Sequence, residues 1–169
     1  MKTAAMIALA VALTGCAGWK INGVDFSQMD GGDFIAAAAG VGTSFAIHSL
    51  SHMAACEAMG GDCHYDGTSE IANGLSDAEM DVFGHAGFVG QLAVGYAMKW
   101  AGVKNSFSTG YNAGTLAEIA LYPITTPMVC EGNDINYTGH AAWAGYTLAA
   151  AGLFIEKKQD MEVVHAAQD

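Results

Sequence analysis

Four long segments rich in alanine and glycine make up most of the chain, and loops of Gly, Asn, Asp and Ser separate them. Few runs of β-branched residues occur in these segments, so they favour helices over strands. We expect the helices at residues 33–59, 76–102, 113–126 and 138–155. The pattern therefore predicts an all-α fold in which about four helices pack as an Ala/Gly-rich bundle.

Local signals set the ends of these helices. Ser76 and Glu79 have the spacing of a capping box, which predicts that the second helix begins there. Pro123 and Pro127 interrupt the third helix, so we expect it to be kinked or short. Two lysines at 157–158 follow the fourth helix, and positive charge suits a helix C-terminus.

The N-terminus has the pattern of an export signal. One positive charge precedes the apolar residues 4–13, which are too few to span a bilayer. The sequence Leu13-Thr14-Gly15-Cys16 resembles the lipobox of bacterial lipoproteins. That resemblance implies a signal peptide at 1–15 and a lipid attached to Cys16. Ala17, in place of Asp, further implies sorting to the outer membrane, on its periplasmic side.

The rest of the chain has the size of one domain, which is enough to bury a core. Residues 16–32 are rich in glycine and polar side chains, and they would form a lipidated tether. The helical bundle occupies residues 33–158, and residues 159–169 form a polar tail.

The chain is strongly acidic, because 17 Asp and Glu residues outnumber 6 Lys and Arg and give a formal net charge of −11. Such a surface repels polyanions, so we exclude nucleic acid as a partner. The partners that remain are the membrane, through the N-terminal lipid, and another protein of the cell envelope.

Two apolar segments, 82–98 and 139–155, lie at the lower length limit for crossing a bilayer. If the helices did cross, the two loops on the cytoplasmic side would contain no Lys or Arg. The lysines outside would then violate the positive-inside rule: Lys104, Lys157 and Lys158. We therefore favour a compact bundle held at the membrane by lipid, with a polytopic membrane bundle as the alternative.

The first predicted helix carries a polar stripe. Ser44, His48, His52 and Cys56 are spaced by four residues and would stack on one face. Two imidazoles at i and i+4 have the spacing by which a helix offers two nitrogen atoms to one metal ion. His48 lies about 6 Å deeper in the bundle than His52, level with Glu118 if the third helix is continuous.

Other histidines lie at matching depth. At about 1.5 Å rise per residue, His52 and His85 both lie roughly 10–12 Å below the same end of the bundle. We predict a metal site of His48, His52 and His85, completed by Asp81 or His140, and zinc suits imidazole ligands. The alternative is a set of hydrogen-bonded core histidines without a metal.

Residues 46–60, AIHSLSHMAACEAMG, also resemble the zinc helix of intramembrane site-2 proteases, a H-E-x-x-H segment followed by small apolar residues. Ser49 stands where that family has its catalytic Glu, and serine has no acid–base use near neutral pH. The family's later Asp ligand has no match. The resemblance therefore implies metal binding with the peptidase chemistry lost.

Two other functions remain open. His85 and His140 are each preceded by Gly and followed by Ala, which leaves room for a b-type haem with these two axial ligands. Covalent c-type haem is excluded because the chain has no C-x-x-C-H motif. A structural or partner-binding lipoprotein without catalysis is the other alternative. No motif of a common enzyme class is present, so the sequence leaves open whether the protein is an enzyme.

Three cysteines remain besides Cys16, and in an oxidising compartment one disulfide is expected. We predict that Cys63 pairs with Cys130, because both lie in loops at one end of the bundle. A bond from Cys56 to one of these two is the alternative.

Overall fold

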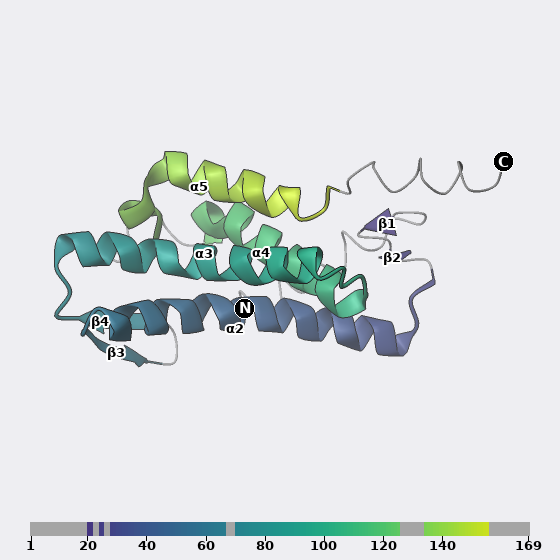
Figure 1. The fold of residues 1–169 in the computed structure, drawn as a ribbon, viewed down its shortest axis with the longest axis horizontal. Helices are drawn as coiled ribbons and strands as arrows, with labels where there is room; N and C mark the ends of the chain where they lie inside the picture. Colours follow the sequence, from purple (N-terminus) through teal and green to yellow (C-terminus); the bar gives the residue numbers. More distant parts are fainter. Residues whose placement is uncertain (1–19, 22–23, 26–27, 67–69, 126–133, 156–169) are drawn as a thin grey trace.

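The computed structural model describes residues 20–21, 24–25, 28–66, 70–125 and 134–155. Within these residues the protein is largely all-α, with 76% of them helical, which confirms the predicted fold class. The four helices are α2 (Gly31–Ala58), α3 (Asp77–Trp100), α4 (Ser106–Thr125) and α5 (Asp134–Gly152), and they form one bundle (Figure 1). The signal peptide with Cys16, the tail at 159–169 and Cys130 lie outside the described residues.

Two short antiparallel hairpins accompany the helices. Strand β1 (Lys20–Ile21) pairs with β2 (Val24–Asp25) within the predicted tether. Strand β3 (Asp62–Tyr65) pairs with β4 (Glu70–Asn73) in the segment that we expected to be a loop. The second hairpin, the β3–β4 hairpin, joins α2 to α3 at one end of the bundle (Figure 1).

Capping boxes begin α2 and α3. At the start of α2 the backbone N–H of Asp33 donates to the Asp30 carboxylate at 2.9 Å, and the Asp33 carboxylate accepts from the Asp30 N–H at 3.3 Å. At the start of α3 the Ser76 N–H donates to the Glu79 carboxylate at 2.7 Å, which confirms the predicted box. Each box satisfies N–H groups that the first turn of a helix leaves without a partner.

Helix α4 begins at Ser106, seven residues before the predicted start at 113. Asn105 and Ser108 exchange hydrogen bonds at its first turn, where the Ser108 N–H donates to the Asn105 side chain at 2.9 Å. Residues 105–112 have the composition of a loop, yet most of their side chains are buried against the rest of the bundle. Tertiary packing has overridden their weak helix propensity.

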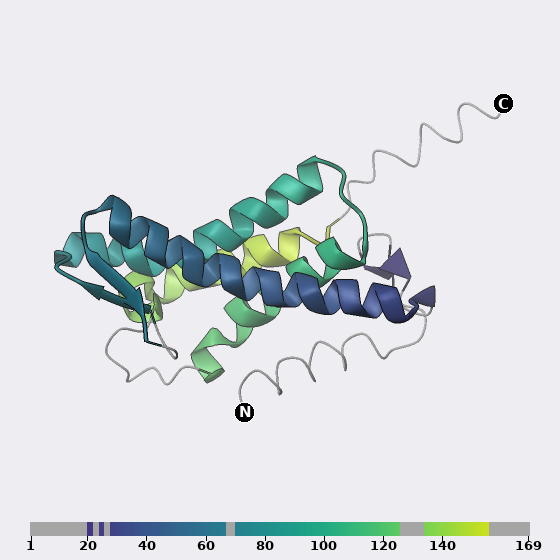
Figure 2. The ribbon, with the colours of Figure 1, turned by 90° about the horizontal axis from the view of Figure 1, so that it is seen from below.

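Glycine lets α2 and α4 approach closely. A Cβ on Gly40 would lie 2.1 Å from the carbonyl oxygen of Phe107, and one on Gly110 would lie 2.0 Å from that of Ala37. The two backbones therefore touch, as small residues permit at helix contacts. Figure 2 shows α4 crossing α2 obliquely at this contact.

The interior has an apolar part and a polar part. An apolar cluster connects α3, α4 and the C-terminal end of α5: Phe88, Leu92, Ile119, Ala150 and Leu153. Among the described residues nine polar side chains are also buried: Ser44, His48, His52, Gln91, Ser106, Ser108, Thr109, Asn112 and Thr115. The candidate site lies in this polar part.

Candidate functional site

The polar stripe of α2 faces the inside of the bundle. The buried residues of this helix are Gly40, Ser44, His48, His52 and Cys56, each four residues after the last. Close helical packing against α3 and α4 covers this face, so 5% of His48 and 1% of His52 remain exposed to solvent. The two imidazoles thus lie in the interior, where each polar atom needs a partner.

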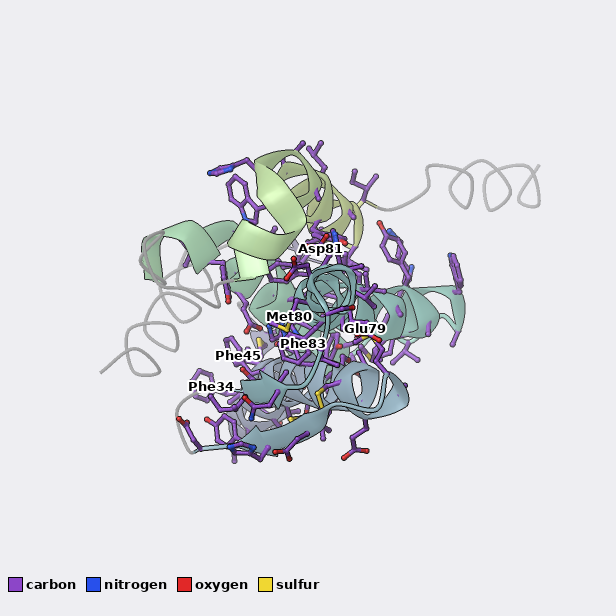
Figure 3. All side chains as sticks on the ribbon, turned by 90° about the vertical axis from the view of Figure 1, so that its left-hand side faces the viewer. Phe34, Phe45, Glu79, Met80, Asp81 and Phe83 are labelled. Carbon is purple, nitrogen blue, oxygen red and sulfur yellow. A yellow bond between two sulfur atoms is a disulfide. The ribbon has the colours of Figure 1, made fainter. Side chains whose placement is uncertain are left out.

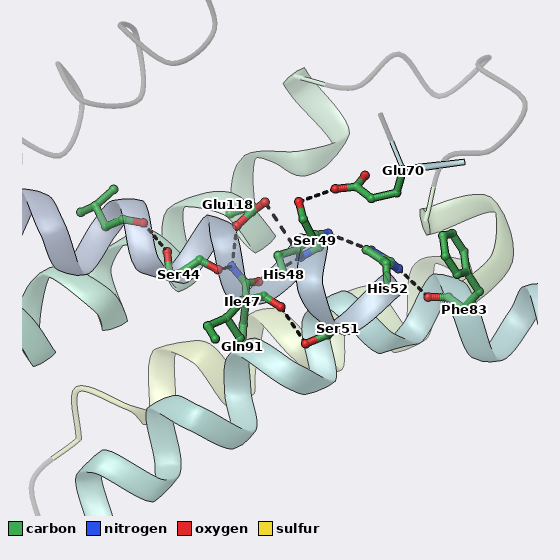
Figure 4. Close-up of polar contacts among 11 residues, drawn as sticks. Ser44, Ile47, His48, Ser49, Ser51, His52, Glu70, Phe83, Gln91 and Glu118 are labelled. Atoms are coloured by element: carbon green, nitrogen blue, oxygen red, sulfur yellow. Dashed lines mark hydrogen bonds and ion pairs between the residues drawn. The ribbon is translucent and has the colours of Figure 1, made fainter. Parts of the chain in front are cut away.

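The two histidines meet through equivalent nitrogen atoms. The Nε2 atom of His48 lies 3.0 Å from the Nε2 atom of His52, and the ring centroids are 4.6 Å apart. Figure 4 shows the pair at the centre of a polar network that joins α2 to α3 and α4. We call these two residues the histidine pair.

The other nitrogen of each ring faces an oxygen that only accepts hydrogen bonds. His52 Nδ1 lies 2.7 Å from the carbonyl oxygen of Phe83, and His48 Nδ1 lies 3.2 Å from Oε1 of Gln91. The Gln91 amide is held in this orientation because its Nε2 donates to the Ser44 carbonyl at 3.0 Å and to the Glu118 carboxylate at 2.5 Å. Both Nδ1 atoms must therefore carry hydrogen.

The positions of the Nδ1 hydrogens determine what the two Nε2 atoms present to each other. A neutral imidazole carries one N–H, so with hydrogen on both Nδ1 atoms the two Nε2 lone pairs face each other across 3.0 Å. Two acceptors at that distance repel unless a cation lies between them. A proton or a metal ion would satisfy the pair. The Glu118 carboxylate lies 3.9 Å from His48 Nδ1 and provides compensating negative charge.

Gly87 of α3 covers the histidine pair. A Cβ at this position would lie 2.4 Å from His52 Nε2 and 2.6 Å from His48 Nε2. Contacts this short do not occur for real side chains, so residue 87 must be glycine for α3 to approach the pair. The site therefore depends on α3 as well as on the spacing within α2.

The structure brings together two of the five predicted metal ligands. His85 Nδ1 lies 2.5 Å from the hydroxyl of Tyr146 on α5, while Asp81 and His140 are exposed. Within the described residues no group of three or more His, Cys, Asp or Glu side chains is arranged to hold a metal ion. Any metal at the histidine pair would thus have two protein ligands from this part of the chain.

His85 lies away from the histidine pair because its side chain leaves α3 on a different side of the helix. His52 contacts α3 at Phe83, near the depth that we expected for His85. His85 follows Phe83 by two residues, which is roughly 200° around a helix, so its side chain points to α5 instead of α2. Residue counting gives depth along a bundle and leaves the rotation of each helix open.

Three groups around the histidine pair were not predicted from the sequence: the side chain of Gln91, the glycine at position 87 and the carbonyl of Phe83. Gln91 had one available signal, because it is a lone amide in the long uncharged segment 82–98. A buried amide in such a segment needs partners from other helices. Glu118 carries the same kind of signal, as the one charged residue of α4.

The disulfide differs from the predicted one. Cys56 and Cys63 are bonded, with their Cα atoms 6.1 Å apart, so the predicted pairing of Cys63 with Cys130 is wrong and the alternative, a bond from Cys56 to one of these two, is confirmed. The β3–β4 hairpin folds directly onto the last turn of α2, and this turn brings Cys63 back to Cys56 after only seven residues. The Ser49 hydroxyl also donates to the carboxylate of Glu70 on the hairpin, which fixes the hairpin against α2.

Comparison of the chain with protein-family models, with curated proteins and with solved structures gives no match. The histidine pair is the part of the described structure whose geometry departs most from an ordinary helical core, because two buried imidazoles meet there through their Nε2 atoms.

Proposed function

We propose that this chain is a lipid-anchored helical protein of the bacterial envelope that binds one cation at the histidine pair. The observation that carries the proposal is the meeting of His48 Nε2 and His52 Nε2 at 3.0 Å, with both Nδ1 atoms facing acceptors. A cation between the two lone pairs removes their repulsion.

Zinc is the proposed metal, because imidazole suits it. Zinc–nitrogen bonds of about 2.0–2.1 Å at a tetrahedral angle place two nitrogen atoms about 3.3 Å apart, so the rings need separate by only a few tenths of an ångström. The Phe83 carbonyl and the Gln91 side chain occupy the positions from which oxygen atoms orient metal-binding histidines.

The proposed role is binding and not catalysis. The rings of His48 and His52 are almost fully buried, and Gly87 covers their Nε2 atoms. A substrate would have to displace α3 to reach a metal there. Ser49, at the position of a catalytic Glu, points to the hairpin and donates to Glu70, away from the pair.

A second candidate is a structural proton. The separation of 3.0 Å between the Nε2 atoms lies within the normal range of an N–H···N hydrogen bond. A shared proton would make the pair an imidazole–imidazolium, with the charge of Glu118 nearby. The protein would then be a structural or partner-binding lipoprotein whose polar interior fixes how its helices pack.

Metal analysis of the protein purified without a histidine tag separates these two functions. The metal proposal predicts about one zinc ion per chain in the wild type, lost in His48→Ala and His52→Ala. His85→Ala is the matched control and should keep the metal, because His85 binds Tyr146 outside the pair. A wild type that takes up no zinc, and shows one shared proton between the rings by nitrogen-15 NMR, would overturn the metal proposal in favour of the proton.

A further inference from the structure

The middle of the bundle carries almost no charge. Helix α2 has no charged residue between Asp33 and Glu57, and α3 has none between Asp81 and Lys99. Helix α5 has none after its first residue, and the single charged residue of α4, Glu118, is partly buried and bonded to Gln91. At about 1.5 Å per residue these uncharged lengths approach the roughly 30 Å of a bilayer core.

Large apolar side chains are exposed on several helices over this middle region. On α2, Leu50 is 62% exposed; on α3, Val89 is 50% exposed; on α5, Leu148 is 75% exposed. Helices α2 and α5 form opposite sides of the bundle (Figure 1), so the apolar surface is not confined to one face. These side chains lie on three different helices, within the stretches of those helices that carry no charged residue.

The interior is correspondingly polar. Besides glycine, nine polar and eight apolar side chains are buried within the described residues. The inward stripe of α2 contains Ser44, His48 and His52, whereas its outer side contains Ile35 and Leu50. A helix of a water-soluble protein has the opposite arrangement. Polar and small residues between helices, with apolar residues outside, are typical of membrane bundles.

Three hydroxyl groups on the helices are satisfied within their own helix, whereas the buried hydroxyls of Thr109 and Thr115 on α4 have no hydrogen-bond partner among the described residues. Thr43, Ser51 and Thr147 each donate to the carbonyl four residues earlier, at 2.8, 2.7 and 3.1 Å respectively. In hydrocarbon no water is available to bond such groups, so intrahelical bonds of this kind are required there. The polar residues of α2 between Thr43 and His52 are thus turned inward, bonded to their own helix or, in the case of Ser49, bonded to Glu70 of the β3–β4 hairpin.

The charged groups lie at the two ends of the bundle. The β3–β4 hairpin end carries acids: Glu57, Asp62, Asp66, Glu70, Asp77, Glu79 and Asp81. Figure 3 looks onto this end, where Glu79 and Asp81 mark the start of α3. The opposite end carries Lys99, Lys104, Asp30 and Asp33 together with Trp100, which is 84% exposed. Charged ends with an aromatic residue and apolar flanks are the layout of a bundle that spans a bilayer, whereas the acidic hairpin end, if it faces the cytoplasm, runs against the positive-inside rule.

Length and composition qualify α2 alone, among the described helices, to cross a membrane, and 17% of its most apolar window is buried in the bundle. The other helices contain more polar residues, such as Gln91 of α3 and Asn112 and Thr115 of α4. These three side chains are buried. They lower the hydropathy of the helix without adding polar surface outside.

We propose that lipid acyl chains cover the flanks of this bundle, so that the protein lies within a bilayer instead of beside it. The acyl chains would contact the side chains of Leu50, Val89 and Leu148 on three different helices. This proposal depends neither on a cation at the histidine pair nor on a lipid at Cys16.

Spin-label accessibility tests the proposal residue by residue. The full chain carrying Cys16→Ser and Cys130→Ser is the background, so that the introduced cysteine is the one that takes the spin label. Leu50→Cys, Val89→Cys or Leu148→Cys is added to it, and each labelled variant is reconstituted into phosphatidylcholine vesicles. Tyr65→Cys, on the β3–β4 hairpin and 57% exposed in the wild type, is the matched control. Circular dichroism verifies that each variant keeps its helices.

In lipid, the three flank labels should collide at least several-fold more with oxygen than with a water-soluble nickel chelate, and the Tyr65→Cys label should show the reverse. Flank labels that resemble the hairpin label would place the flanks in water and overturn the proposal. Labels that neither reagent reaches would mean that protein covers the flanks, which would also overturn the proposal. Separation of the Cys16→Ser chain from the vesicles would overturn it as well, because the bundle would then stay at a membrane only through the lipid attached to Cys16. Zinc content is measured separately, so failure here leaves the histidine-pair proposal standing.

Discussion

The Nδ1 atom of His52 lies 2.7 Å from the carbonyl oxygen of Phe83. This contact joins a side chain of α2 to the backbone of α3 and sets the rotation of the imidazole. Because the acceptor is a backbone atom, substitution of the Phe83 side chain leaves the acceptor in place. His52 Nε2 is thereby directed at His48, and the proposed binding of a cation by the pair depends on this orientation.

We expect His52→Ala to destabilise the protein by about 2–4 kcal/mol, because it leaves a cavity and removes the partner of a buried carbonyl. If zinc is bound, a chelator should lower the thermal midpoint of the wild type and hardly affect this variant. His85→Ala is the control, since it should retain the response to chelator. Equal responses of the wild type and His52→Ala to chelator would contradict the expectation.

The all-α fold could be predicted because composition, helix caps and loop residues indicate it independently. Ser76 and Glu79 predict the start of α3, and the structure has their capping box. The start of α4 could not be predicted in this way. Serine and asparagine in 105–112 usually indicate a loop, and only their burial against other helices makes that segment helical.

The candidate site was predictable within α2 and not between helices. The spacing of His48 and His52 fixes their common face, because the period of a helix is constant. The partners Phe83 and Gln91 depend on how α3 is rotated about its axis, which residue counting does not determine. The disulfide to Cys63 depended in the same way on a hairpin that the sequence pattern did not reveal.

Glu79 should make stability depend on pH. The hydroxyl and the backbone N–H of Ser76 donate to its carboxylate, and these bonds lower the pKa of Glu79 below its ordinary value of 4.5. A pKa that is lower in the folded chain stabilises it fully above about pH 4.5, and this stabilisation is lost as the pH falls through the folded pKa.

The variant Glu79→Gln should therefore be less stable than the wild type at pH 7, and the difference should shrink below pH 4.5, the ordinary pKa. Thermal unfolding followed by circular dichroism measures this difference. In a Ser76→Ala background, Glu79→Gln should have a smaller effect, because the side-chain hydrogen bond is already absent. A difference that stays constant between pH 7 and pH 3 would refute the assignment.

Lipid attachment at Cys16 remains a prediction from the lipobox resemblance. Cells that express the full chain and are fed a tagged fatty acid should label the wild type and Cys130→Ser, but not Cys16→Ser. Cys130→Ser controls for acylation at any available thiol. Equal labelling of Cys16→Ser and the wild type would place the acyl group elsewhere and remove the lipid anchor from the proposed function.

Gly87→Ala should damage the site with the smallest possible change of side chain. The added methyl group would lie 2.4 Å from His52 Nε2 and 2.6 Å from His48 Nε2, so α3 or the imidazoles must move. Overpacking of this kind costs about 1–3 kcal/mol, and the shift should also lower zinc binding or disrupt the shared proton.

Gly145→Ala is the matched control on α5, because a Cβ there meets nothing within 4 Å. Alanine is the better helix former, so this control should be neutral or stabilise the protein by up to about 1 kcal/mol. Thermal unfolding and zinc titration are measured on both variants. If Gly87→Ala is as stable as Gly145→Ala and keeps the wild-type affinity for zinc, the histidine pair does not lie against α3 as described, and its two Nε2 atoms are not held face to face by that helix.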